Sequence, residues 1–263
     1  MHHTEQAINS WLRISHPKPQ ASLRLFCLPY AGGAASLYRA WHQLVPTDIE
    51  VCAVQLPGRE NRIREQPFTD VGELVQALIP NLLPHLDRPF AFFGHSMGSL
   101  IVYELAQQLR QQMGQSPTHL FVSGRRAPFL PASEASLHTL PTDEAFLTEL
   151  QRRYNNIPAV MFEDADLRNL FVPLLRADFT LVERYQCRII TPLPCPIVAF
   201  GGESDSRTSG ADLMAWQELT QDAFNLHLLP GGHFYLNEHT QALIAYINRY
   251  LSQDSLPKPL ASS

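Results

Sequence analysis

The sequence predicts a single α/β domain with a mostly parallel central sheet and helices on both faces. Its 263 residues are close to the size at which a single hydrophobic core stops growing. Several short apolar runs lack polar alternation, which is typical of strands covered on both faces. Segments with apolar residues three or four apart separate these runs, so strands and helices alternate along the chain.

Each strand is expected where an apolar run is bounded by Gly or Pro. The predicted strands are residues 23–30, 49–57, 89–95, 118–124, 195–202 and 224–231. Helical periodicity predicts helices at residues 37–44, 71–86, 97–113, 212–219 and 239–251. In this architecture the parallel strands end at one carboxyl edge of the sheet, where functional loops meet.

The segment from about residue 127 to 186 breaks the alternation. It contains Pro-punctuated helical sequence such as PTDEAFLTELQRRY and no convincing strand. We therefore expect a helical insertion within one domain of residues 1–263, rather than a second domain. Such insertions commonly form lids over active sites. The alternative is a helical layer without a gating role.

Charge and cysteine content disfavour several classes of protein. Twenty basic and 25 acidic residues give a net charge of −5, which attracts neither nucleic acid nor an anionic membrane. The sequence shows no signal peptide and no apolar segment of the ~18 residues that a membrane span needs. The four cysteines form no CxxC pair, which predicts buried thiols in a reducing compartment. We expect a cytoplasmic protein.

Residues 94–98, GHSMG, fit the nucleophile-elbow pattern G-x-S-x-G. PFAFF before the motif reads as a strand and SLIVYELAQQL after it as a helix, which is the context the elbow requires. The flanking glycines give room for a turn that strains Ser96. A helix N-terminus at Ser96 would also favour negative charge. The pattern therefore predicts Ser96 as a nucleophile.

A serine hydroxyl needs a base, and His233 is the best placed of the 11 histidines. It follows the last predicted strand, where two glycines let the chain turn over the carboxyl edge of the sheet. Asp205, after the preceding strand, is predicted to orient the imidazole, with Glu203 and Asp178 as alternatives. The order Ser96, Asp205, His233 matches that of α/β hydrolases.

Acyl transfer also requires N–H donors for the developing oxyanion. The backbone N–H of Met97, directly after the nucleophile, is one predicted donor. The second should come from the loop after the first strand, where Ala31 is predicted and Tyr30 or Gly32 are alternatives.

Five spaced motifs together resemble the stand-alone type II thioesterases that accompany nonribosomal peptide and polyketide synthases. They are PYAGG (29–33), QLPGRENR (55–62), GHSMGSLIVYELA (94–106), GGESD (201–205) and PGGHFYL (230–236). The resemblance implies an α/β-hydrolase fold with a helical lid, which clears stalled or aberrant acyl groups from carrier proteins in an antibiotic or siderophore pathway.

Carried over to this chain, the resemblance implies a triad of Ser96, Asp205 and His233, with Ala31 and Met97 forming the oxyanion hole. It implies no metal or organic cofactor, because the phosphopantetheine arm belongs to the substrate. The residues after Asp205, SRTSG, depart from the family, in which an apolar residue often follows the acid. We expect a monomer.

Two other functions stay open: a carboxylesterase or lipase with the same triad, and a catalytically silent binding module. A carrier protein is usually acidic, so a docking enzyme needs a local basic surface. The candidate positions are Arg59, Arg62, Arg64, Arg125, Arg126, Arg152 and Arg153.

Overall fold

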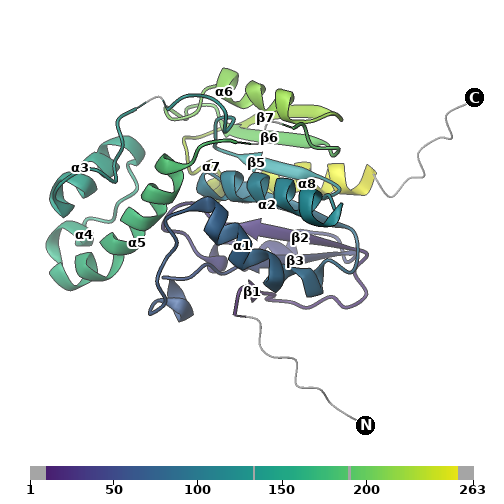
Figure 1. Ribbon diagram of the computed structural model, residues 1–263, viewed down its shortest axis with the longest axis horizontal. Helices are drawn as coiled ribbons and strands as arrows, with labels where there is room; N and C mark the ends of the chain where they lie inside the picture. The colour runs from purple at the N-terminus through teal and green to yellow at the C-terminus, as the bar shows by residue number, and fades with distance from the viewer. Residues whose placement is uncertain (1–9, 133, 189–190, 254–263) are drawn as a thin grey trace, which may run out of the picture.

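The computed structural model describes residues 10–132, 134–188 and 191–253. In this part of the chain a seven-stranded sheet has the order β1-β3-β2-β4-β5-β6-β7 (Figure 1). Its strands are β1 (Leu12–Arg13), β2 (Leu23–Leu28), β3 (Ile49–Val54), β4 (Phe90–His95), β5 (Leu120–Ser123), β6 (Ile197–Gly202) and β7 (Phe224–Leu229). All neighbours are parallel except β1, which runs antiparallel to β3. The mostly parallel sheet predicted from the sequence is confirmed.

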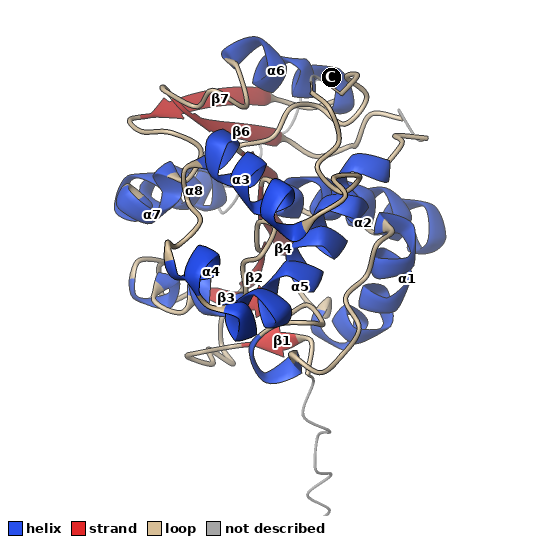
Figure 2. Cartoon of the chain, turned by 90° about the vertical axis from the view of Figure 1, so that its left-hand side faces the viewer, coloured by secondary structure: helices blue, strands red, loops and turns tan. Residues whose placement is uncertain are grey.

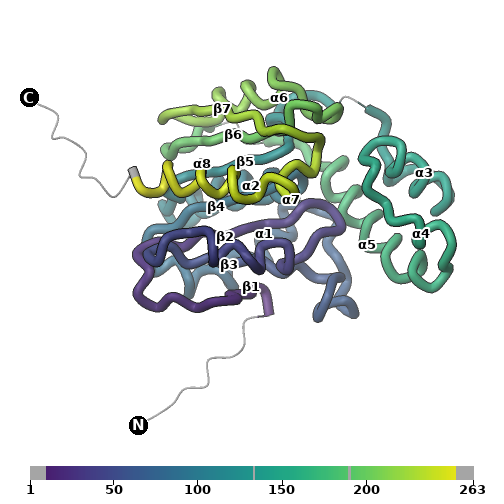
Figure 3. The backbone as a smooth tube through the Cα atoms, turned by 180° about the vertical axis from the view of Figure 1, so that it is seen from behind, coloured from purple at the N-terminus to yellow at the C-terminus, as the bar shows by residue number. Residues whose placement is uncertain are grey.

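Helices cover both faces of the sheet, as Figures 1 and 3 show from opposite sides. One face carries α1 (Val71–Leu82), α2 (Met97–Met113) and α6 (Gly210–Met214), and the other carries α7 (Tyr235–Glu238) and α8 (Thr240–Gln253). Phe26 and Leu28 of β2 pack into the first layer, whereas Leu25 and Cys27 pack into the second. Burial of both sets explains why the strand reads as a continuous apolar run.

The predicted helix at residues 37–44 is wrong in type. The chain forms two short 3₁₀ helices there, η1 (Ala35–Tyr38) and η2 (Trp41–Gln43). Tyr38 and Trp41, three residues apart, are both buried against Phe93 of the sheet. Tyr38 ends η1 and Trp41 begins η2, so the two successive short helices bring both rings to the same side. Further 3₁₀ turns are η3 (Glu60–Arg62), η4 (Leu83–His85) and η5 (Ala215–Leu219).

Three helices stand apart from the sheet and cover one end of it (Figure 2). They are α3 (Asp143–Tyr154), α4 (Val160–Glu163) and α5 (Ala165–Arg184), and the described part of residues 127–186 contains no strand. Their apolar side chains form a cluster of their own, which includes Phe146, Leu150, Met161, Val172 and Phe179. The three helices therefore share a core of their own, while Leu181 of α5 also packs into the core beside the sheet.

The predicted domain of residues 1–263 includes residues 1–9, 133, 189–190 and 254–263, which lie outside the described residues. None of the four described cysteines takes part in a disulfide, and Cys27, Cys52 and Cys195 are buried. Within the described ranges, no helix is long and apolar enough to cross a bilayer.

Candidate active site

Ser96 lies at the sharp turn between β4 and α2, with φ 52° and ψ −109°. A side chain at Gly94 would place its Cβ 2.3 Å from the backbone of Gly98. At Gly98 it would lie 2.2 Å from the carbonyl oxygen of Leu28. Both contacts are too short for any Cβ, so only glycine allows the strand and helix to meet this closely. The strained Ser96 conformation depends on this packing, which is the physical content of the GHSMG motif.

The structure brings Ser96, His233 and Asp205 together at the carboxyl edge of the sheet. The Nε2 atom of His233 lies 3.1 Å from the Oγ of Ser96. Its Nδ1 lies 2.8 Å from Oδ2 of Asp205, whose side chain is fully buried. The other carboxylate oxygen, Oδ1, accepts a hydrogen bond of 2.8 Å from the backbone N–H of Arg207. An ionised carboxylate only accepts, so Nδ1–H donates to Asp205 and leaves Nε2 to accept from the Ser96 hydroxyl.

Neither alternative acid contacts His233. Glu203 is exposed on the loop after β6. Asp178 is buried on α5, where it accepts hydrogen bonds from the guanidinium of Arg59 and from the backbone N–H of Gly32. Glu203 therefore faces solvent and Asp178 is engaged with Arg59 and Gly32, so neither carboxylate orients the imidazole of His233.

The loop after β2 lies beside Ser96, and Ala31 and Met97 both line the cavity at the serine. The Gly32 N–H is already used, because it donates to Oδ2 of Asp178 at 2.7 Å. The Gly33 N–H donates to the carbonyl of Tyr30 at 2.9 Å. The Gly32 alternative is therefore disfavoured as an oxyanion donor in this conformation.

The sequence interpretation missed the role of Arg59. Its side chain is 4% exposed and donates to Asp178 at 2.8 Å and to the carbonyl of Gly33 at 2.9 Å. Arg62 is also buried and pairs with Glu65. These two arginines are internal, so they are wrong as candidates for a docking surface. One feature of the sequence could have indicated this role. Asp178 lies within the largely apolar helical sequence LLRADFTL, and a buried carboxylate needs a charged or hydrogen-bonding partner.

A second histidine lies directly behind the site. The Nδ1 atom of His95 is 2.7 Å from the Ser123 hydroxyl, which is itself 2.5 Å from the Tyr235 hydroxyl. The His95 ring is buried, with its centroid 5.2 Å from that of His233. Burial, together with the proximity of His233, holds the pKa of His95 well below its ordinary value. His95 is therefore a neutral support for the loop that carries His233.

Two cavities meet at Ser96 and His233. The first, which we call the apolar chamber, has a volume of about 330 Å³ and lies between the sheet edge and helices α3 to α5. Its apolar wall consists of Leu150, Ile157, Pro158, Met161, Phe171, Leu174, Leu175, Phe179 and Val182. The second, the polar chamber, measures about 160 Å³ and contains Arg125, Arg126, Glu134, Arg153, Glu183 and Arg207 in its wall.

The ring of Tyr154, at the end of α3, packs against that of His233 with centroids 5.2 Å apart. Tyr154 and Ser96 both line the two chambers. The helical segment thus contacts His233 itself. Among the described residues, no group of three or more His, Cys, Asp or Glu side chains could hold a metal ion.

The model of the thioesterase domain family matches residues 23–251. The chain belongs to this family. The thioesterase is 43% identical to the gramicidin S biosynthesis protein GrsT of Aneurinibacillus migulanus, over 95% of this chain and 97% of that protein. It is 36% identical to thioesterase PikA5 of Streptomyces venezuelae, over 92% of this chain and 85% of the relative.

The fold of the thioesterase is also similar to that of a solved type II thioesterase. The type II thioesterase BorB from the borrelidin biosynthetic cluster is 37% identical, with a TM-score of 0.82. The match covers 92% of this chain and 97% of BorB. The sheet topology and this likeness together establish an α/β-hydrolase fold, as the sequence predicted.

Proposed function

We propose that this thioesterase is a type II enzyme that hydrolyses stalled or aberrant acyl thioesters on the phosphopantetheine arm of carrier proteins. The observation that carries the proposal is the alignment of Ser96, His233 and Asp205 at the junction of the two chambers. The substrate class is supported by relatives named for gramicidin S and borrelidin biosynthesis. The enzyme acts as a cytoplasmic monomer in a nonribosomal peptide or polyketide pathway, without metal or organic cofactor.

In the first half of the reaction His233 removes the Ser96 proton as Oγ attacks the thioester carbonyl. The backbone N–H groups of Met97 and Ala31 hold the oxyanion, and the dipole of α2 adds to its stabilisation. The carbon–sulfur bond then breaks, and the departing thiol receives the proton from His233. An acyl ester on Ser96 remains.

Water completes the cycle. His233 takes a proton from the water as it attacks the acyl ester, and returns that proton to Ser96 when the ester bond breaks. Asp205 stabilises the imidazolium formed in both halves. The apolar chamber receives the acyl chain, because its wall is made of aliphatic and aromatic side chains beside the serine. The helices α3 to α5 act as the lid of this chamber.

The decisive variant is Ser96→Ala, which should lower thioester hydrolysis by ~10⁴-fold or more while the fold is retained. Ser36→Ala, an exposed serine of η1, is the matched control and should keep wild-type activity. A folded Ser96→Ala protein with near wild-type turnover would remove the assignment.

The carrier role is tested with one acyl group on two supports. The acyl carrier protein thioester should show a higher kcat/KM than the same acyl group on a small thiol, because remote contacts orient the thioester. Equal values, or a preference for oxygen esters, would instead indicate a general esterase.

A further inference from the structure

The polar chamber has an excess of positive charge beside the reacting serine. Its wall carries four arginines and two glutamates, Arg125, Arg126, Arg153, Arg207, Glu134 and Glu183. The formal sum is 4 − 2 = +2 for these side chains. The chamber shares Ser96, His233 and Arg125 with the apolar chamber, so its charge acts at the site of the reaction.

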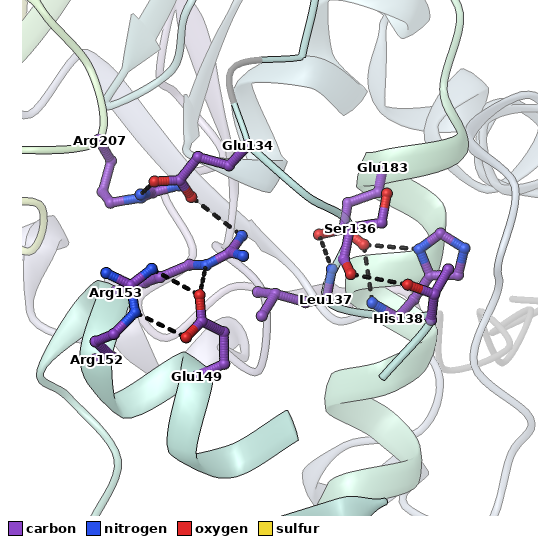
Figure 4. Close-up of polar contacts among 10 residues, drawn as sticks. Glu134, Ser136, Leu137, His138, Glu149, Arg152, Arg153, Glu183 and Arg207 are labelled. Atoms are coloured by element: carbon purple, nitrogen blue, oxygen red, sulfur yellow. Dashed lines mark hydrogen bonds and ion pairs between the residues drawn. The ribbon is translucent and has the colours of Figure 1, made fainter. Parts of the chain in front are cut away.

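Three of the four arginines are paired with carboxylates. Arg126 lies 2.8 Å from Asp212. Arg153 lies 3.1 Å from Glu134, which also binds both terminal nitrogens of Arg207 (Figure 4). Their charges are therefore largely compensated within the protein.

The second glutamate of the wall is also engaged. Glu183 accepts the backbone N–H groups of Leu137 and His138 at 2.8 and 2.9 Å. One of its oxygens also lies 2.7 Å from Nδ1 of His138, as Figure 4 shows. This carboxylate holds the start of the lid segment.

Arg125 differs from its three neighbours. Within the described residues its guanidinium makes no hydrogen bond or ion pair, and its Nε is buried without a partner. Its carbonyl accepts the Trp216 indole N–H at 2.7 Å, which fixes the backbone at this point. Burial lowers the pKa of Arg125, yet an arginine stays charged at neutral pH. A partly desolvated cation held in this way is stabilised by an incoming anion.

We propose that Arg125 forms an anion subsite of the active centre, which selects acyl groups that carry a free carboxylate. This inference rests on the proposed thioester hydrolysis at Ser96 and names its preferred substrate class. The carboxylate of a dicarboxylic acyl group enters beside the serine and pairs with the guanidinium, whereas an acyl group with an ammonium is repelled.

The anion could also be the phosphate of the phosphopantetheine arm. That phosphate is separated from the thioester sulfur by the whole length of the pantetheine chain. Arg125, in contrast, lines the same two cavities as the reacting serine. Position therefore favours the acyl group as the source of the anion, and the experiment includes both sources.

The test compares adipyl with hexanoyl thioesters, which have the same chain length and differ in the terminal carboxylate. Each acyl group is presented on pantetheine, which lacks phosphate, and on phosphopantetheine. Wild-type protein should favour adipyl by about 10-fold or more in kcat/KM, as expected for a desolvated charge-assisted pair. Arg125→Met should abolish this preference and Arg125→Lys should retain part of it. Arg126→Met, which removes a paired arginine of the same wall, should preserve it.

Other outcomes are equally informative. No adipyl preference in the wild type, or one that survives in Arg125→Met, would overturn the proposal. A loss in Arg125→Met that is seen only on phosphopantetheine, and equally for both acyl groups, would assign the anion to the arm and also overturn it.

A binding measurement separates this proposal from the proposed function. Ser96→Ala protein should bind adipyl-pantetheine more tightly than hexanoyl-pantetheine in calorimetry, and the Arg125→Met exchange should remove the difference. If the wild type hydrolyses neither thioester, the proposed function fails while these affinities still decide the subsite.

Discussion

Arg59 and Asp178, which lie 119 residues apart in the sequence, form a buried ion pair with two hydrogen bonds of 2.8 and 3.2 Å. Arg59 follows β3, and Asp178 lies on α5 of the proposed lid. Both also hold the loop after β2, because Asp178 accepts the Gly32 N–H and Arg59 donates to the carbonyl of Gly33. The pair thus fixes the backbone next to Ala31, the proposed oxyanion donor.

Asp178→Asn should lower kcat by about 10²-fold, because a small misplacement of an oxyanion donor is enough for such a loss. Steady-state hydrolysis of a short acyl thioester measures the effect. Asp143→Asn is the matched control, since Asp143 pairs with Arg176 at the lid surface. It should change kcat less than twofold if loop position is what matters.

A double variant separates loop position from stability. Asp178→Asn leaves a buried arginine without its full partner, which destabilises the protein by about 3–5 kcal/mol at most. Replacing both members, Arg59→Met with Asp178→Leu, should recover much of this stability in urea unfolding. The kcat of the double variant should stay low. If stability and kcat both recovered, the ion pair would have only a structural role.

Much of the architecture could be predicted because it depends on local sequence. The five inner strands β2 to β6 are mostly apolar runs bounded by Gly or Pro, and they are buried along their whole length, so their sequences show little polar alternation. The edge strand β7 is only partly buried, but Gly and Pro still mark its end. The elbow could be predicted because Gly94 and Gly98 leave no room for a side chain. His233 and Asp205 could be placed near Ser96 because all three follow parallel strands that end at one edge.

What could not be predicted depends on contacts between distant segments. Strand β1 has two residues and carries no pattern. The side-chain partner of Asp178 lies in another motif, so the sequence alone left it as a possible acid and Arg59 as a possible surface residue. The unpartnered state of Arg125 likewise depends on distant contacts, because Asp212 pairs with Arg126 and Glu134 pairs with Arg153.

Asp205→Asn should reduce kcat by about 10³–10⁴-fold, because an amide cannot hold the required tautomer of the base. Glu203→Gln, two residues away and exposed, should have little effect. Comparison of the two rates for one thioester tests the assignment of the acid. The reverse ranking would make Glu203 the partner of His233 and would require a different loop conformation in solution.

His95 should make the stability of the protein depend on pH. Its pKa in the folded protein lies well below the ordinary value of about 6.5 that holds in the unfolded chain. Below that pH the unfolded state binds a proton that the folded state does not, so the free energy of unfolding falls as the pH falls. The contribution is at most about 1.4 kcal/mol per pH unit.

Urea unfolding of wild type and His95→Asn between about pH 7.5 and 5 checks this dependence. The variant should lose the part of the slope that begins below about pH 6.5, whatever its absolute stability. His85 and His227 also have lowered pKa values, but they are present in both proteins and cancel in the comparison. Identical slopes would mean that His95 is protonated in the folded state.

The lid should open unevenly. The cluster of Phe146, Leu150 and Met161 is separate from both cores beside the sheet, so α3 and α4 can move away without disrupting either core. Helix α5 is different, because Asp178 ties its second half to Arg59. Hydrogen exchange should therefore be fast over residues 143–163 and slow around residue 178.

A stable thioether analogue of an acyl-pantetheine should slow exchange over residues 143–163, because it fills the apolar chamber and contacts both the lid and the sheet edge. Asp178→Asn should extend fast exchange into the second half of α5, whereas Asp143→Asn should not. Strong protection throughout the lid, unchanged by the analogue, would instead describe a static helical layer through which substrate enters by another route.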